Sequence, residues 1–367
     1  MMNPFESCTN LIRNAVANGQ IPSAALAVGV KDQIYVKETF GTVSILPDAA
    51  SVNETTLYDM ASVSKMLSTT MIALRLIEHG VLDLADMLPR YFGSRVPDDK
   101  KEITVFQLLT HTSGIPAHFF LEELLPTGAD PTDAILQYPL AYQPGTQVVY
   151  SCMGFILLGK LMETAAGSSL DQLAKEEVFG PLGMTSTGYH PLNQPIDSSN
   201  TAYTEKNHLT GDWLCGQVHD ENAYFLNGVS GNAGIFSNLN DCIRFAQMLA
   251  GHGTLEGNVW LPRCIFDTAI QNYTPGMDEN RGLGFHLACG HFSYSGQFFD
   301  QNGFGHNGFT GPHIFVSPTT GLYVVLLTNR VHPTRANSAH LRLRRLLHTQ
   351  AAIGYEKLTA SPDLNWI

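Results

Sequence analysis

The sequence predicts an α+β fold, an α/β sandwich in which an antiparallel sheet is flanked by helices. Two strand patterns indicate the sheet, one near each end of the chain. In residues 24–40, apolar and β-branched residues flank a polar turn at Lys31-Asp32. In residues 311–330, two apolar runs flank a Pro-Thr-Thr-Gly turn. Because the patterns between these ends are mostly helical, we expect both ends to share one sheet, with a large helical insertion between them.

Helices are expected beside the terminal strands and throughout the central region. The patterns that predict them combine helical spacing of apolar residues with Gly- and Pro-containing boundaries. They lie at residues 5–18, 62–79, 104–111, 153–166, 170–178, 239–251 and 335–352.

This order of elements divides the chain into two parts. We assign residues 1–59 and 278–367 to a sheet subdomain and residues 60–277 to an inserted, mainly helical subdomain, with the functional site between them. Two connecting segments, 112–148 and 185–235, are unusually long. Long loops in compact domains tend to be functional, although these two can also be plain surface connections.

Composition and charge narrow the class of protein. With 367 residues, 44% of them hydrophobic and 15% charged, the chain has the composition of a globular protein. Its net charge of -12 and its 21 Lys and Arg residues argue against a nucleic-acid partner. The local basic cluster of Arg342, Arg344 and Arg345 is expected to be a solvated helix face.

The location of the protein is predicted from segments that the sequence lacks and from its cysteines. It contains neither an apolar run long enough to span a membrane nor an N-terminal signal-peptide core. Its six cysteines, which include Cys289, form no CxxC pair. Scattered thiols suit a reducing compartment, so we expect a cytoplasmic protein with no membrane partner. The oligomeric state is not predicted.

The quartet Ser62-Val63-Ser64-Lys65 is the first candidate for chemistry. Residues three apart on a helix share a face, so Ser62 and Lys65 can meet at the start of an apolar helix. A desolvated lysine with a lowered pKa can remove the proton that keeps a serine inert. A structural alternative makes Ser62 an N-cap and Lys65 a snorkelling side chain, and the quartet alone does not exclude it.

The whole chain resembles the superfamily of penicillin-binding proteins, class C β-lactamases and their esterase and D-peptidase relatives. The resemblance covers nearly the full length, which favours a single domain of this kind. Six segments carry it in order: YDMASVSK (58–65), ITVFQLLTHTSGIP (103–116), PGTQVVYSCMGFILLGKLMETAAG (144–167), GPLGMTST (180–187), GNAGIFS (231–237) and GHNGFTGPHIFVSP (305–318).

The resemblance implies roles for individual residues. Ser62 would be the nucleophile of the S-x-x-K motif, Lys65 its base and Tyr150 the proton shuttle. The backbone N–H groups of Ser62 and Phe309 would form an oxyanion hole. The expected substrate-binding residues are Cys152, His306, Asn307, Gly308 and Phe309. Gly308 lacks a side chain, which would let a substrate strand approach the backbone.

Two positions depart from the family motifs. Cys152 stands where the second motif usually has Asn, and a thiol is a poor hydrogen-bond partner. His306 replaces the Lys of the third motif and lessens the fixed positive charge available for a substrate carboxylate. Both changes weaken a β-lactamase or D,D-carboxypeptidase assignment. As an alternative, Cys152 is a second nucleophile, but we favour a small buried residue.

Other polar residues admit structural interpretations. The fourteen histidines include no HExxH motif, so neither a metal nor another cofactor is expected. His111 is interpreted as a structural histidine that bonds a loop backbone. The segment 218–222 can line a substrate cleft or form an exposed loop.

The predicted function is a serine hydrolase that forms an acyl-enzyme on Ser62. Its expected partner is a small ester, peptide or amide substrate, which makes it a carboxylesterase or a D-amino-acid or cell-wall-peptide amidase. One alternative is a weak β-lactamase or D,D-carboxypeptidase. An alternative of another class is a non-catalytic sensor that binds β-lactams or peptides.

Overall fold

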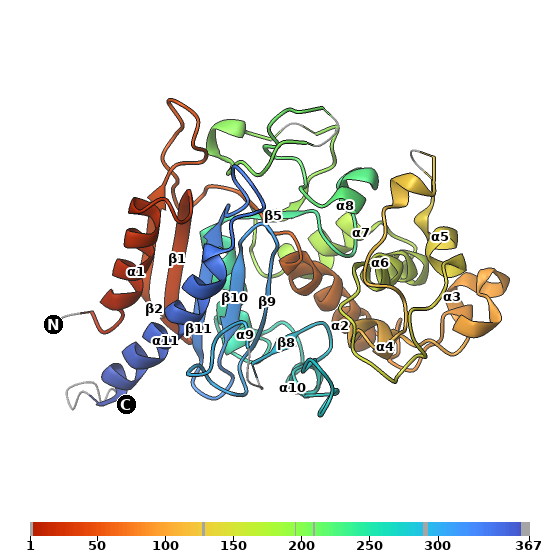
Figure 1. The fold of residues 1–367 in the computed structure, drawn as a ribbon. Helices are drawn as coiled ribbons and strands as arrows, with labels where there is room; N and C mark the ends of the chain where they lie inside the picture. Colours follow the sequence, from red (N-terminus) through yellow and green to blue (C-terminus); the bar gives the residue numbers. More distant parts are fainter. Residues whose placement is uncertain (1–2, 127–128, 195, 208–209, 289–292, 361–367) are drawn as a thin grey trace.

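A six-stranded antiparallel sheet forms the centre of the fold, with strands from both ends of the chain (Figure 1). The structure, a computed structural model, describes residues 3–126, 129–194, 196–207, 210–288 and 293–360. The strand order is β2-β1-β11-β10-β9-β8. The strands are β1 (Ser23–Val30), β2 (Gln33–Gly41), β8 (His286–Leu287), β9 (Phe304–Asn307), β10 (His313–Val316) and β11 (Leu322–Thr328).

Strands β1 and β11 are buried on both faces. Along β1 and β11, alternate residues enter two different hydrophobic clusters, as the two-residue period of a strand requires. Leu26 and Leu326 face the terminal helices α1 (Glu6–Ala17) and α11 (Ala339–Ala360). Their neighbours on the strands face the other side, where α9 (Leu239–Ala250) contacts β1, β10 and β11. The predicted sheet and its flanking helices are therefore confirmed.

The remaining helices gather beside the sheet (Figure 1). They are α2 (Met71–Glu78), α3 (Pro89–Phe92), α4 (Val105–Leu109), α5 (Pro131–Gln137), α6 (Cys152–Ala166), α7 (Leu170–Leu173), α8 (Glu221–Phe225) and α10 (Arg263–Ala269). Short strands make a second sheet, β3-β5-β4, from β3 (Tyr58–Asp59), β4 (Gly188–Tyr189) and β5 (Ile235–Ser237), and a hairpin of β6 (Thr254–Leu255) and β7 (Asn258–Val259). The proposed subdomain boundaries stay a prediction.

Two predicted helices differ in pitch. Within the predicted helix at 170–178, α7 continues into a π-helix, Ala174–Phe179. The pattern over residues 62–79 predicts an α-helix, but Lys65–Thr70 is a π-helix that continues into α2. The spacing of apolar residues indicates that this segment is buried. It does not determine which carbonyl each backbone N–H bonds. Widened turns of this kind occur frequently at functional sites.

Two further features concern the length and polarity of the helices and the state of the cysteines. In the described parts of the chain, no helix is both long enough and apolar enough to cross a membrane. The cysteines in those parts carry free thiols, and Cys289 lies outside the described residues.

Candidate active site

Ser62 lies directly before the helical segment that carries Lys65. The preceding residue, Ala61, has a φ of 44°, which is unusual for a residue with a Cβ and typical of strained functional turns. Lys65 is fully buried, and its Nζ donates hydrogen bonds to Ser62 Oγ at 3.1 Å and to the Asn232 carbonyl at 2.9 Å. Cys152 Sγ lies 3.5 Å from the same nitrogen. The structure thus brings the predicted pair together.

The pKa of Lys65 differs from the lowered value that is expected from the sequence for a desolvated lysine. Burial disfavours the ammonium, but the neighbouring Cys152 and Tyr150 groups outweigh burial, and the pKa of Lys65 is raised. The predicted lowering of this pKa is therefore wrong. Its physical cause is that two acidic groups converge on the buried nitrogen from segments distant in the sequence. Lys65 holds its proton in the resting site.

Tyr150 lies just before α6, where the Ser151 hydroxyl caps the helix by accepting from Gly154 N at 2.9 Å. The Lys65 Nζ lies 4.9 Å from the centre of the Tyr150 ring. The Tyr150 hydroxyl is buried and has no hydrogen-bond partner among the described residues. Burial raises the pKa of Tyr150, although the Lys65 charge opposes this effect. A buried polar atom without a partner is costly, which is typical of a site that receives a ligand.

His111 supports the backbone beside Tyr150. Its Nδ1 accepts from Ser151 N at 3.0 Å, and its carbonyl accepts from Val149 N at 3.0 Å. Its ring lies 4.7 Å from the Tyr150 ring. The interpretation of His111 as a structural histidine that bonds a loop backbone is confirmed.

The third motif lies at the end of β9. His306 is 1% exposed, and its Nδ1 donates to the Asn307 carbonyl at 2.9 Å, because a carbonyl can only accept. Its Nε2 is then an acceptor, without a partner in the described residues. Burial and the charges of Lys65 and Arg281 hold the pKa of His306 well below its ordinary value, so the ring is neutral. The His286 ring lies 4.4 Å away, edge to face.

Gly308 and Phe309 continue from this strand past Ser62. A Cβ on Gly308 would lie 2.5 Å from the Met60 carbonyl, so the approach of the Ser62 turn itself requires glycine here. Arg330 contacts Phe309 in two ways. Its Nε donates to the Phe309 carbonyl at 2.7 Å, and its guanidinium lies 4.3 Å from the centre of the Phe309 ring.

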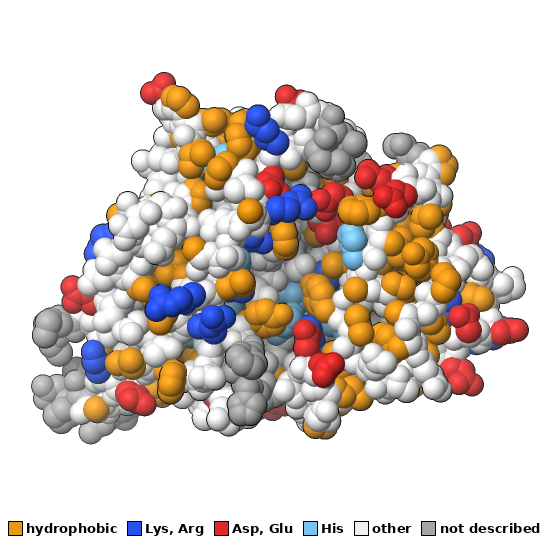
Figure 2. Space-filling view, viewed as in Figure 1, with side chains coloured by type: hydrophobic (Ala, Val, Ile, Leu, Met, Phe, Trp, Pro, Cys, Tyr) orange, Lys and Arg blue, Asp and Glu red, His pale blue; other side chains and the backbone are white. Residues whose placement is uncertain are grey.

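These residues surround one cleft of about 650 Å³. Seven of the predicted residues line it, and Lys65 lies buried beside Ser62. In Figure 2 the cleft is a hollow near the centre, with histidine side chains inside it. Both long loops contribute, and the segment 218–222 lines the cleft through three residues. The lining comprises Ala61, Ser62, Ala117, His118, Tyr150, Cys152, His219, Asp220, Glu221, His286, Tyr294, His306, Asn307, Gly308, Phe309, Arg330, Arg335, Ser338, His340, Leu341 and Arg344.

The C-terminal segment gives this cleft a cationic wall that the sequence did not reveal. Arg342 and Arg345 are exposed as expected, but Arg344 is 3% exposed and lines the cleft. The Arg344 Nε is buried without a partner among the described residues. Burial lowers the pKa of Arg344 to about 10. The prediction that all three arginines form a solvated face is wrong for Arg344, because α11 turns this residue toward the site.

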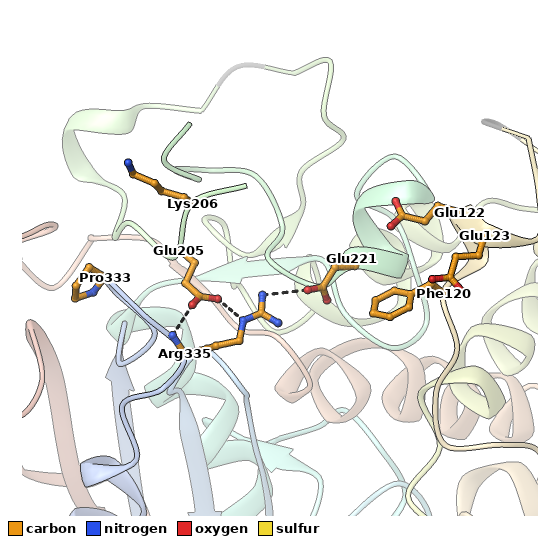
Figure 3. A pocket seen from close by; sticks show the side chains of 8 residues that line it. All are labelled: Phe120, Glu122, Glu123, Glu205, Lys206, Glu221, Pro333 and Arg335. Atoms are coloured by element: carbon orange, nitrogen blue, oxygen red, sulfur yellow. Dashed lines mark hydrogen bonds and ion pairs between the residues drawn. The ribbon is translucent and has the colours of Figure 1, made fainter. Parts of the chain in front are cut away.

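Arg335 bridges the mouth of the cleft. It donates to Glu205 and, at 3.0 Å, to Glu221 (Figure 3). Burial disfavours the Glu205 carboxylate, but hydrogen bonds from His219 and Arg335 lower the pKa of Glu205 to about 2. A second hollow of about 540 Å³ lies beyond this bridge and shares Arg335 and Glu221 with the cleft. Its other lining residues are Phe120, Glu122, Glu123, Glu205, Lys206 and Pro333.

Comparison with known proteins decides the family. The family model described as Beta-lactamase matches residues 9–349. The chain belongs to the beta-lactamase family. It is 32% identical over 359 residues to the N-acetylmuramyl-L-alanine amidase of Bacillus subtilis strain 168, covering 88% of this chain and 80% of the relative. A protein of Escherichia coli K12, provisionally named a D-alanyl-D-alanine carboxypeptidase, is 30% identical, with 85% and 79% covered.

Solved structures share the fold of this beta-lactamase family member. EstCE1, described as a hydrolase with promiscuous acyltransferase activity, superposes with a TM-score of 0.76 at 19% identity, covering 96% of this chain and 98% of that one. A penicillin-binding protein homologue from Caulobacter crescentus gives 0.74 at 18% identity, covering 95% and 98%. The resemblance inferred from the motifs is confirmed, and the protein is a serine hydrolase of this family.

Proposed function

We propose that this protein hydrolyses an amide or ester through an acyl-enzyme on Ser62. The contact between Lys65 Nζ and Ser62 Oγ at 3.1 Å, at the wall of the cleft, carries the proposal. The unpartnered Tyr150 hydroxyl in the same cleft adds a proton-transfer group. Two such groups beside a serine are the arrangement that nucleophilic catalysis requires.

Acylation would begin with attack of Ser62 Oγ on the substrate carbonyl. Because the pKa values of Lys65 and Tyr150 are both raised, the resting pair holds both protons and becomes a base only after it loses one. The Ser62 proton then passes to this pair and on to the leaving group. In deacylation, a water molecule gives its proton to the same pair and attacks the ester on Ser62. The bond between the acyl carbon and Ser62 Oγ then breaks, the pair returns the proton to Ser62 Oγ, and the carboxylic acid leaves.

The backbone N–H groups of Ser62 and Phe309 would stabilise the negative oxygen of the tetrahedral intermediate. This role needs a fixed backbone at both positions. Gly308 packs against the turn before Ser62, and Arg330 holds the Phe309 carbonyl, so the two donors are held relative to each other. Arg330 would thus act as a positioning residue for the oxyanion hole.

The substrate class we favour is a peptide or amide with an anionic group. Arg330 and Arg344 line the cleft and supply positive charge that the neutral His306 does not. The charge of Arg335, in contrast, is paired with Glu205 and Glu221. The Bacillus subtilis relative, named an N-acetylmuramyl-L-alanine amidase, supports a cell-wall-peptide amidase. A carboxylesterase is the second candidate, because Cys152 lacks the amide group that an Asn would offer to a substrate amide.

Intact-mass spectrometry tests the proposal. The wild-type protein is exposed separately to an activated ester, a β-lactam and a D-alanyl peptide and compared with Ser62→Ala. We expect a transient adduct on the wild type and none on the variant. Ser64→Ala is the matched control: the Ser64 hydroxyl is buried and accepts from Ile235 N, so the control loses stability but keeps acylation.

The outcomes separate the candidate functions. An adduct that never decays would favour a β-lactam- or peptide-binding sensor over a hydrolase. If none of the three reagents labels or is turned over by the wild type, the acyl-enzyme mechanism is refuted. Faster turnover of the ester than of the peptide would favour the carboxylesterase.

A further inference from the structure

Arg281 is a buried cation on the segment that leads into β8. Its side chain is 1% exposed. Its backbone N–H donates to Thr274 Oγ1 at 2.8 Å, and its carbonyl accepts from Tyr273 N at 2.9 Å. The guanidinium pairs with Glu279, whereas its Nε and Nη1 are buried without a partner among the described residues. A buried guanidinium whose nitrogens lack some of their hydrogen-bond partners lowers the stability of the fold. This cost indicates a functional reason for an arginine at this position.

The guanidinium lies against the ring of Tyr150. Its central carbon is 5.2 Å from the ring centre, close to the 4.9 Å that separates Lys65 Nζ from the same point. Two cations therefore face one phenol. Lys65 also contacts Ser62 and Cys152, whereas Arg281 is absent from the lining of the cleft.

Three imidazoles complete the surroundings of Tyr150. The ring centres of His111, His286 and His306 lie 4.7, 5.8 and 6.0 Å from that of Tyr150. Burial is the main cause that holds the pKa of each histidine well below its ordinary value, and the charge of Arg281 adds to it in every case. All three rings are neutral, so the positive charge facing the phenol comes from Lys65 and Arg281.

We propose that Arg281 is a positioning residue for Tyr150, which supplies against the phenol ring the fixed positive charge that His306 does not carry. The inference rests on the proton-transfer role proposed above for Tyr150. A cation near a phenol favours its phenolate, and in a buried site the interaction is weakly screened. A guanidinium is a fixed positive charge, whereas the charge of an imidazole changes near neutral pH.

The pH profile of kcat/KM tests this role. In the wild type, kcat/KM should rise with pH, and we call this part of the profile the rising limb. In Arg281→Gln, the rising limb should shift to higher pH by about one unit. The value of kcat/KM should then fall approximately tenfold near neutral pH and recover at higher pH. Arg281→Lys should largely restore the wild-type profile. Arg75→Gln is the control, because Arg75 also pairs with a carboxylate, Glu78, but contacts Trp260 rather than Tyr150. A uniform loss in Arg281→Gln with an unmoved limb would show a merely structural role.

A second variant decides the question if Arg281→Gln fails to fold. Glu279→Gln removes the anion that partly neutralises Arg281, so the limb should move to lower pH, and an unmoved limb overturns the proposal. Ultraviolet titration of tyrosinate, with Tyr150→Phe to identify the Tyr150 signal, gives a readout without substrate. If wild type forms no Ser62 adduct, the proposed function fails, while this titration still reports whether Arg281 favours the Tyr150 phenolate.

Discussion

The two walls of the cleft differ in how their residues are held. On one wall, Ser62, Lys65 and Cys152 contact one another through a single buried nitrogen. On the other, Arg330 binds backbone carbonyls, while Arg344 is buried without a partner for its Nε. The first wall holds the proposed reactive residues, and these contacts form without substrate. The second wall carries positive charge that remains available to a ligand, which suits recognition of an anionic group.

The largest effect should come from the reactive wall. Lys65→Met preserves most of the side-chain volume but removes the group that contacts Ser62 Oγ, so we expect kcat/KM to fall by roughly a thousandfold. Lys160→Met is the control, because Lys160 pairs with Glu163 on α6 and is absent from the cleft lining. Steady-state hydrolysis of an activated ester measures both. A loss below tenfold for Lys65→Met would remove Lys65 from the mechanism.

The pH dependence sharpens the description of the reactive wall. Burial raises the pKa of Tyr150 and the pKa of Lys65 is also raised, so the deprotonated, base-competent pair is a minor form at neutral pH. Its population grows as pH rises, and the rate should increase by about tenfold per pH unit through neutrality. Because His306 is already neutral, its titration does not change the rate in this pH range. A flat rate between pH 6 and about pH 9 would contradict these assignments.

The recognition wall should respond to substrate charge. Arg344→Gln should lower kcat/KM for a substrate with a carboxylate by about ten- to a hundredfold, the usual worth of a charged hydrogen bond. A neutral ester of the same length should be nearly unaffected. Arg345→Gln is the matched control, because Arg345 is the exposed neighbour on α11. Equal losses for the charged and the neutral substrate would argue against recognition by this wall.

The smallest effect should come from Cys152, the position that we expect to distinguish amide substrates from ester substrates. Cys152→Asn should raise amide turnover relative to ester turnover by roughly two- to tenfold, because the carboxamide can bond a substrate amide. Cys152→Ser is the control, since a hydroxyl is small like the thiol and lacks the carboxamide. Paired kinetics on an amide and an ester with the same acyl group give the ratio. An unchanged ratio in Cys152→Asn would show that this position does not choose between them.

Local pattern predicted much of the fold. The apolar and β-branched residues on either side of the Lys31-Asp32 turn, and the apolar runs on either side of the Pro-Thr-Thr-Gly turn, predicted a sheet built from both chain ends. The pitch of Lys65–Thr70 was missed, because apolar spacing reports burial and not the carbonyl that each N–H reaches. His111 was correctly interpreted, because its Nδ1 accepts a hydrogen bond from the Ser151 backbone N–H.

The sequence by itself determined the family and the candidate reactive residues, because ordered motifs place Ser62, Lys65, Tyr150 and His306 without a structure. Only the tertiary structure decided their charges. The raised pKa of Lys65 depends on Cys152 and Tyr150, which lie far along the chain. Arg281 and Arg344 carry no local signal, and each reaches the site because its burial depends on the packing of separate segments. Charge and desolvation act through space, so residue order alone cannot fix them.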